Sequence, residues 1–197
     1  MGKGRLEAFS DGVIAIIITI MVLEMKAPHS DDLNSLKPVF PVFISYLLSF
    51  INIGIYWNNH HHMMHLVQRI DGKVLWANLH LLLWLSLVPF ATAWMGENHF
   101  TPVPVAVYGV VLFFAGVSYS VLAYTLIRLH GKNSALATAL GRDQKGKISI
   151  GIYFIGIILS NVNAWISFTL YALVAAIWFI PDRRIEKNFS ENQKKDG

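Results

Sequence analysis

Long apolar stretches separated by short polar segments dominate this sequence. The six stretches are Ala8–Met25, Val39–His60, Val74–Met95, Val103–Ile127, Ile148–Ser160 and Ala164–Ile180. Most of them match the roughly 20 apolar residues that an α-helix needs to cross a bilayer. The pattern predicts an all-α membrane protein with six transmembrane helices. Residues 1–181 are expected to form the membrane domain, and residues 182–197 a polar cytoplasmic tail.

The last two stretches are predicted to form a helical hairpin. Only Asn161, Val162 and Asn163 separate them, which is too short for a loop that crosses any other element. The stretch Ile148–Ser160 is also shorter than a full span. We therefore expect its helix to be tilted or incomplete.

The distribution of basic residues predicts the orientation of the helices. With six spans, 14 of the 16 Lys and Arg residues fall on one side. They are Lys3, Arg5, Arg69, Lys73, Arg128, Lys132, Arg142, Lys145, Lys147, Arg183, Arg184, Lys187, Lys194 and Lys195. Because cytoplasmic loops carry the excess of Lys and Arg, both termini are expected in the cytoplasm, and the protein in the cell membrane.

Composition narrows the possible functions. The chain is 54% hydrophobic and 14% charged, whereas a soluble domain is roughly 25% charged. The net charge of +4 is accounted for by the basic loops, so it predicts no nucleic-acid partner. The absence of cysteine from the sequence excludes thiolate nucleophiles and zinc–thiolate or iron–sulfur sites.

Polar residues at the start of the first helix stand out because charge is costly inside a membrane. Ser10 and Asp11 lie within its apolar run, so they must face protein or water rather than lipid. One interpretation is that Ser10 and Asp11 stabilise the start of the helix, where the helix dipole favours a carboxylate. Arg5 lies a little over one turn earlier, so a buried polar clamp of Arg5, Ser10 and Asp11 is the alternative.

Four residues further along the same helix share one face. Ile16, Thr19, Ile20 and Leu23 are spaced i, i+3, i+4 and i+7, which aligns them on one helical stripe. Any apolar helix has such stripes, so core or lipid contact is the ordinary interpretation. Thr19, however, is the one hydroxyl in an otherwise unbroken apolar run.

Two motifs resemble the transmembrane protein 175 family of potassium-selective channels. Arg5-x-x-x-Phe9-Ser10-Asp11 is similar to that family's R-x-x-x-F-S-D signature. Tyr56-Trp57-Asn58-Asn59-His60-His61 is similar to its Y-W-x-x-H-H stretch. A departure is Gly12, where some relatives have alanine, and this affects packing rather than the pore.

The resemblance implies a passive potassium channel without a T-V-G-Y-G filter and without a cofactor. It implies a homotetramer in the bilayer, in which the first helix of each copy lines a central pore and potassium is the permeant ion. Carried over to this sequence, the constriction falls on Ile16, the hydroxyl layer on Thr19, and further apolar rings on Ile20 and Leu23. An apolar ring of this kind gates by expelling water.

Histidines at the end of the second helix suggest two other interpretations. Trp57, His60 and His61 share one face and are expected to pack against the clamp. His61 and His65 also have the i, i+4 spacing of a metal pair, but neither Cys nor carboxylate completes a ligand set, so no metal site is predicted. A membrane enzyme or haem- or metal-binding protein that uses these histidines and His80 with Asp11, and an ion-coupled transporter, remain as alternatives. A transporter would more often show repeats and broken helices.

Overall fold

The computed structural model describes residues 2–140 and 143–179, and the described chain is helical with no strand. Its elements are α1 (Lys3–Leu23), the 3-10 helix η1 (Leu33–Leu36), α2 (Phe40–His65), α3 (Gly72–Ser86), α4 (Val88–Glu97), α5 (Pro102–His130), α6 (Ala135–Leu140), α7 (Gln144–Leu159) and α8 (Ala164–Phe179). The predicted tail, residues 182–197, lies outside the described residues.

Four candidate membrane spans are present in the described part of the chain, by length and composition. They are α1, α2, the α3–α4 pair and α5. Helices α7 and α8 have 16 residues each, fewer than the roughly 20 of a full span. They form the predicted hairpin, and Gln144 to Lys147 add a first turn to α7 that the hydropathy pattern does not include.

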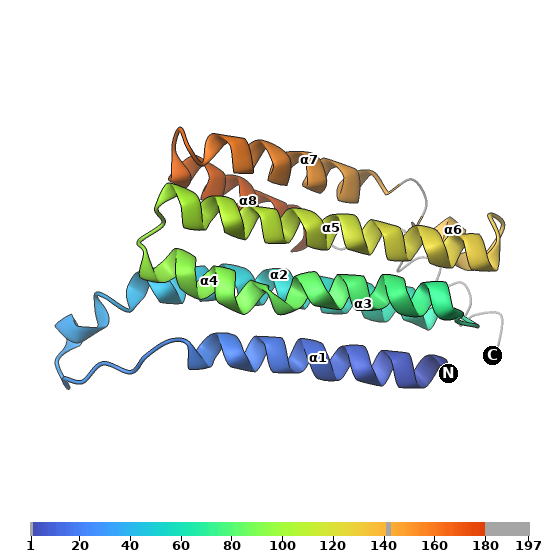
Figure 1. Cartoon of the computed structure of the whole chain (residues 1–197), viewed down its shortest axis with the longest axis horizontal. Coiled ribbons are helices and arrows are strands. Elements are labelled where there is room, and N and C mark those ends of the chain that lie inside the picture. Colours follow the sequence, from blue (N-terminus) through green and yellow to red (C-terminus); the bar gives the residue numbers. More distant parts are fainter. Residues whose placement is uncertain (1, 141–142, 180–197) are drawn as a thin grey trace.

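The predicted third helix is broken. The chain leaves α3 at Ser86, and α4 begins at Val88 with Pro89 in its first turn. Proline has no N–H to donate and its ring clashes with the carbonyl of the preceding turn. The single predicted helix Val74–Met95 is therefore two helices on nearly one path (Figure 1).

The helices stack in layers, with α1 on the outside of the bundle (Figure 1). Helix α1 packs against α2, α3 and α4, while α5 packs against α3 and α4 on one side and α7 and α8 on the other. Only one face of α1 is therefore covered by its own chain. The opposite face is available for contacts outside the protomer.

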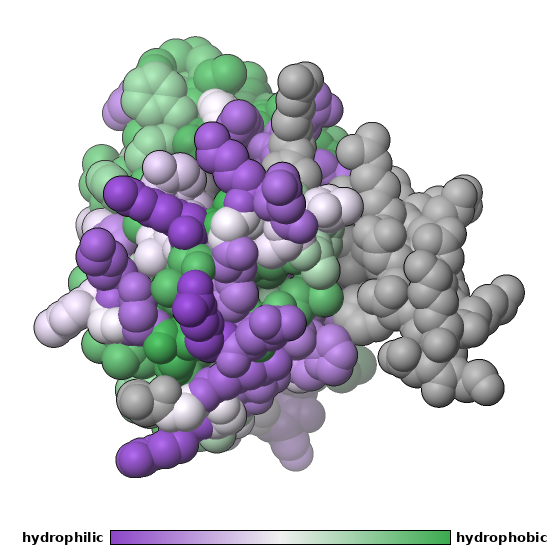
Figure 2. Space-filling view, turned by 90° about the vertical axis from the view of Figure 1, so that its right-hand side faces the viewer, coloured by the Kyte–Doolittle hydropathy of each residue, from purple (hydrophilic) through white to green (hydrophobic). Residues whose placement is uncertain are grey.

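The two ends of the bundle differ in charge. The basic end, defined by Lys3, Arg69, Lys73, Arg128 and Lys145, is where α1 begins, and Figure 2 shows hydrophilic side chains gathered there. The opposite end carries the turn between α7 and α8 and the long connection from α1 to α2, which contains η1 (Figure 1). Most basic residues of the described chain thus share one end.

Candidate functional site

Helix α1 has a buried face that carries the fold. Leu6, Ser10, Ile14, Ile17 and Met21 are all buried, each at most 3% exposed. Their spacing of three or four residues places them on one side of the helix. This is the side that packs against α2, α3 and α4.

The predicted stripe lies off this buried face. Ile16 is 58% exposed, Ile20 40% and Leu23 77%, and Thr19 is exposed as well. A mid-span face of this kind contacts either lipid or further copies of the chain, because its own chain does not cover it. The stripe is therefore free to line a path between protomers.

Thr19 presents an oxygen on this uncovered face. Its hydroxyl donates a hydrogen bond to the backbone carbonyl of Ile16, with 2.9 Å between the two oxygens. Because the proton is used within the helix, the lone pairs of the hydroxyl oxygen stay available as acceptors. An oxygen with free lone pairs is the kind of ligand that a partly dehydrated cation needs.

A groove of about 630 Å³ runs between α1 and α4 beside the stripe. Ile16 and Ile20 line it from α1, and Phe90, Ala93 and Trp94 line it from the other wall. Its walls are largely apolar, so an unfilled groove would be poorly solvated. The groove and the stripe share two residues and form one continuous surface.

Acidic residues lie at the end of this groove that is farther from the basic end of the bundle. Glu24 and Glu97 line it there, and Lys26 forms an exposed ion pair with Glu97 at 3.9 Å. In the nearby connection, hydrogen bonds from the side chain and backbone of Asn34 hold the pKa of Asp32 below its usual value.

Asp11 is tied to α2 rather than to Arg5. The indole Nε1 of Trp57 donates to Asp11 Oδ1 at 3.1 Å. One turn away, His61 Nδ1 lies 3.6 Å from Glu7 Oε1, and the rings of Trp57 and His61 are stacked. Trp57 therefore contacts Asp11, whereas His61 contacts Glu7.

Ser10 belongs to a separate buried chain of hydrogen bonds. Its hydroxyl donates to the carbonyl of Leu6 and accepts from Asn78 Nδ2 of α3, both at 2.9 Å. The Oδ1 atom of Asn78 lies 2.8 Å from His60 Nε2. Asn78 therefore joins α1 to α2. The sequence pattern did not single it out, although it is the one amide within the apolar third helix.

Arg5 takes no part in this support within one protomer. It is exposed, and the described residues contain no ion pair between Arg5 and Asp11. Six residues separate the two, which at 100° per residue places them about 120° apart around the helix. The structure therefore does not form the predicted Arg5–Asp11 contact.

The histidines do not form one centre. His80 lies between Ser118 Oγ and Trp84 Nε1, at 3.1 Å from each, on the α3–α5 side of the bundle. Within residues 2–140 and 143–179, no group of three or more His, Cys, Asp or Glu side chains is placed to hold a metal ion. Among the described residues, no such cluster supports the alternative of a histidine-based cofactor site.

Comparison with known proteins finds relatives that are described as potassium channels. The family described as "Endosomal/lysosomal potassium channel TMEM175" matches residues 5–89. A potassium channel of Chryseobacterium sp. (strain P1-3) is 53% identical over 192 residues, which cover 98% of this chain and all of the relative. A potassium channel of Chamaesiphon minutus is 32% identical over 188 residues, 89% of this chain and 92% of that protein.

A solved structure is similar over nearly the whole chain. It is the crystal structure of a lysosomal potassium-selective channel TMEM175 homolog from Chamaesiphon minutus, 29% identical, with a TM-score of 0.79. The match covers 90% of this chain and 96% of that one. The fold is therefore that of a helical membrane channel and not of an enzyme. The chain belongs to the TMEM175 family.

Proposed function

We propose that this chain is the subunit of a passive, potassium-selective channel whose pore is lined by α1. The observation that carries the proposal is the two-faced α1, with an uncovered apolar stripe interrupted by one hydroxyl. Its relatives, which include proteins named potassium channels, support potassium as the permeant ion.

In this proposal, the stripe selects by dehydration. Ile16 side chains from several copies form a narrow apolar ring, and such a ring tends to expel water. A potassium ion loses its hydration more easily than the smaller sodium ion. Thr19, about one turn further along, offers hydroxyl oxygens that replace part of the lost water, while Ile20 and Leu23 extend the apolar wall.

Assembly into a homotetramer is part of the proposal, because one α1 cannot enclose a pore. A second copy is the proposed occupant of the α1–α4 groove, which is continuous with the stripe. The face of α1 that would approach it carries the small exposed residues Ala8, Gly12 and Ala15. Small residues let membrane helices approach closely, and a Cβ added at Gly12 would meet no atom of its own protomer.

We further propose six spans, with both termini in the cytoplasm of a cell membrane. The hairpin of α7 and α8 would then supply the two short, tilted spans. The clustering of the described Lys and Arg residues at the basic end supports this orientation. Residues 1–181 would constitute the channel domain, with 182–197 as a cytoplasmic tail.

A flux assay on the purified protein in lipid vesicles tests the function. Potassium, sodium and proton gradients of equal size are imposed in separate runs, with protein-free vesicles as the control. We expect potassium flux to exceed sodium flux without any co-substrate. Equal potassium and sodium flux, or flux that requires a second transported solute as in a coupled transporter, would contradict the proposal.

A further inference from the structure

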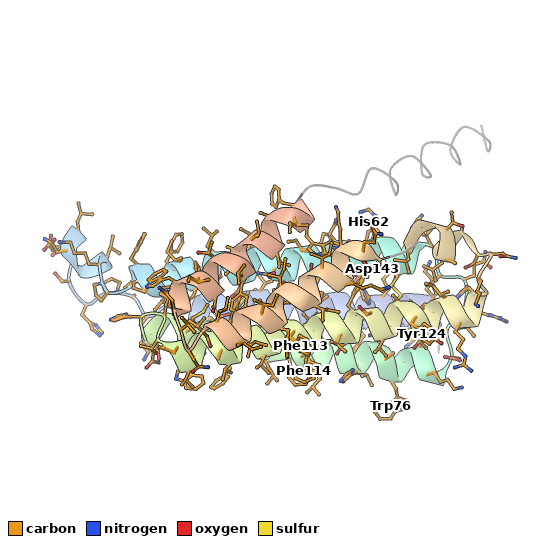
Figure 3. All side chains as sticks on the ribbon, turned by 90° about the horizontal axis from the view of Figure 1, so that it is seen from above. His62, Trp76, Phe113, Phe114, Tyr124 and Asp143 are labelled. Atoms are coloured by element: carbon orange, nitrogen blue, oxygen red, sulfur yellow. The ribbon has the colours of Figure 1, made fainter. Side chains whose placement is uncertain are left out.

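Exposed residues of α3 form a stripe that runs inward from the basic end. Lys73, Trp76, His80 and Leu83 are spaced i, i+3, i+7 and i+10, which keeps them within about 80° of one another around the helix. All four are exposed, and Trp76 is 75% exposed. Figure 3 shows Trp76 pointing away from the bundle. The stripe therefore begins with a cation, continues with aromatic rings and ends on an aliphatic side chain.

A second stripe of similar composition lies on α5. Phe114, Val121, Tyr124 and Arg128 are exposed and spaced i, i+7, i+10 and i+14, again within about 80°. Because α5 ends at the basic end, the order along the chain is reversed. The arginine lies outermost, the phenol follows, and the apolar side chains lie deeper. Both helices thus present a cation, an aromatic ring and apolar surface in the same order of depth.

Two side-chain contacts place the stripes next to each other. Helices α3 and α5 pack together (Figure 1). The rings of Trp84 and Phe114 stack with 4.4 Å between their centroids, and Ser118 Oγ lies 3.1 Å from His80 Nδ1. A step of four residues back along α3 is matched by a step of four residues forward along α5. The two helices are therefore antiparallel, and the depth of a residue on one helix can be compared with that on the other.

The two cations lie at nearly the same depth. Lys73 is seven residues before His80, and Arg128 is ten residues after Ser118. Because His80 and Ser118 are level, the cations differ by three residues, or about 4.5 Å along the helix axes. One headgroup between the two helices is therefore within reach of both side chains.

The aromatic side chains form a second layer. Trp76 lies three residues inside Lys73, and Tyr124 lies four residues inside Arg128, so the aromatic pair is about 5 Å deeper than the cations. Both cations are within two residues of the end of a candidate span. Trp and Tyr are enriched at the headgroup level of a bilayer, and Lys and Arg just outside it. The two layers therefore fall at a membrane surface.

The connection between α2 and α3 adds a third cation. Arg69 Nη2 donates to the backbone carbonyl of Leu129 at 2.9 Å. The backbone N–H groups of Gln68 and Arg69 donate to His130 Nε2, at 3.1 and 3.3 Å. These bonds hold the connection against the last turn of α5. Arg69 is thereby fixed at the same end of the two helices as the cations of the stripes.

One carboxylate is too few to neutralise these three cations. Asp71 is the one acidic residue in segments 66–76 and 121–134. Its Oδ1 atom accepts the N–H of Val74 and caps the start of α3. Within the part of the chain that the structure describes, neither Lys73 nor Arg128 has an ion-pair partner. The resulting net positive charge at a membrane surface attracts anionic headgroups.

We propose that the α3–α5 face binds an anionic glycerophospholipid at the basic end of the bundle. Lys73 and Arg128 donate charge-assisted hydrogen bonds to the headgroup phosphate, and Arg69 adds to the positive field. Trp76 and Tyr124 lie at the depth of the glycerol esters. Among the described residues, neither the indole N–H nor the phenol O–H of this pair has a hydrogen-bond partner, so both are free to donate to ester oxygens.

An acyl chain continues along the apolar part of the two stripes. Leu83, Val121 and Phe114 are between 37% and 55% exposed and supply that surface. His80 does not interrupt it, because its two ring nitrogens already contact Trp84 Nε1 and Ser118 Oγ. This apolar track is the reason to assign the site to a lipid rather than to a free phosphate ion. The site requires only that α3 and α5 lie in a bilayer, so it does not depend on the proposed α1 pore.

The competing explanation is that these residues anchor the helix ends at the membrane surface without selecting a lipid, as Trp, Tyr, Lys and Arg commonly do. A plain anchor predicts equal binding of anionic and zwitterionic phospholipids. A site for free phosphate, in turn, predicts that a soluble phosphate ester displaces the lipid. Both differ from the proposed site in a binding measurement.

The test is native mass spectrometry of the full chain in mild detergent. The protein is titrated with phosphatidylglycerol or with phosphatidylcholine that has the same acyl chains. We expect phosphatidylglycerol to bind about tenfold more tightly. Lys73→Gln and Arg128→Gln should each weaken its binding about fivefold. Lys147→Gln removes a cation from an exposed position in the first turn of α7 and should leave the affinity within about twofold of the wild type.

Two further measurements identify the ligand as a lipid. Trp76→Leu is expected to weaken phosphatidylglycerol binding about threefold, because the ester contact is lost. Glycerol 3-phosphate, added in tenfold excess over the lipid, should not displace it. Equal affinity for the two lipids, unchanged affinity in both cation variants, or displacement by glycerol 3-phosphate would overturn the lipid site. All substituted residues are exposed, so the variants keep the buried core, and a failure of the α1 pore in a flux assay would leave these results unaffected.

Discussion

Ile16 and Thr19 stand about one turn apart on the uncovered face of α1, and they differ in what they offer to an ion. Ile16 supplies only apolar surface, which raises the barrier for any ion that keeps its water. Thr19 supplies an oxygen whose proton is already bonded to the helix backbone. Barrier and ligand can therefore be altered independently, by single substitutions.

Ile16→Asn is expected to raise sodium conductance more than potassium conductance. Asparagine keeps the constriction wet, which lowers the dehydration barrier most for the more strongly hydrated ion. A fall of about 1 kcal/mol in the sodium barrier corresponds to about a fivefold rise in rate. Reversal potentials in planar bilayers with sodium and potassium on opposite sides measure the change.

Ile155→Asn on α7 is the matched control. Ile155 is 52% exposed, close to the value for Ile16, but lies on α7 and not on α2, α3 or α4, the helices that α1 packs against. Unchanged selectivity in Ile16→Asn, in channels that assemble normally, would place the constriction elsewhere.

Thr19→Val should lower the preference for potassium without widening the pore. Valine has nearly the same shape as threonine but lacks the oxygen ligand. The loss of one weak ligand, about 1 kcal/mol, corresponds to about a fivefold drop in the ratio of potassium to sodium permeability. Thr19→Ser retains the oxygen and is expected to behave as the wild type. If Thr19→Val and Thr19→Ser lose selectivity equally, the hydroxyl is not the ligand.

At the scale of elements, the apolar stretches were enough to predict most helices. They were not enough to predict the local exceptions. Helix α5 follows its apolar stretch closely at both ends, because long runs of Ile, Val and Leu satisfy both helix and membrane. Helix α1 begins at Lys3, before the predicted Ala8, because polar residues outside the membrane can also take part in a helix. The break between α3 and α4 depends on Pro89, which hydropathy does not register. The contact of Trp57 with Asp11 followed from helical spacing, whereas Asn78 depends on how α3 packs between α1 and α2.

The polar face of α2 formed by Ser45, Ser49, Asn52, Tyr56 and Asn59 is only partly encoded in a local pattern. Its five residues follow helical periodicity within an apolar helix, so their common face can be recognised from the sequence alone. They do not stand out as charged or histidine residues do, since Ser, Asn and Tyr are ordinary in membrane helices. Their partners on α4, α5 and α7 come from distant parts of the chain, so only the fold assigns them.

Asn78→Ala is expected to weaken the attachment of α1 to the bundle. Ser10 would lose a donor and His60 an acceptor, and each unsatisfied buried group costs about 1–3 kcal/mol. Thermal unfolding in detergent should show a clearly lower midpoint than for the wild type. Asn34→Ala, in the exposed connection after α1, serves as the control and should leave the midpoint unchanged. Equal midpoints for the two variants would show that the Asn78 bridge does not contribute to stability.

At the scale of the whole molecule, the protomer has an incomplete surface. Its α1 stripe and the α1–α4 groove together form an apolar face that its own chain leaves open. Trp76, which Figure 3 shows pointing away from the bundle, and the exposed Tyr124 suit contact with lipid. The groove differs because it is recessed and flanks the stripe, which favours a second copy as its occupant.

Ala93→Trp is expected to block assembly while leaving the protomer folded. Ala93 lines the groove, and an indole there would fill the space proposed for the neighbouring copy. Native mass spectrometry in mild detergent should then show species smaller than the tetramer expected for the wild type. Ala176→Trp adds the same side chain at an exposed position of α8 and should remain tetrameric. A tetramer formed by Ala93→Trp would exclude the groove as the interface.

The division of α1 into a buried and an uncovered face also affects how this channel can evolve. The residues that hold α1 in the bundle are Leu6, Ser10, Ile14, Ile17 and Met21, and none of them belongs to the proposed selectivity stripe. Mutations in the stripe are therefore expected to change the free energy of unfolding little. Core substitutions, by contrast, are limited by the small stability of most proteins. Ion preference can diverge among descendants of this chain while the scaffold stays under purifying selection.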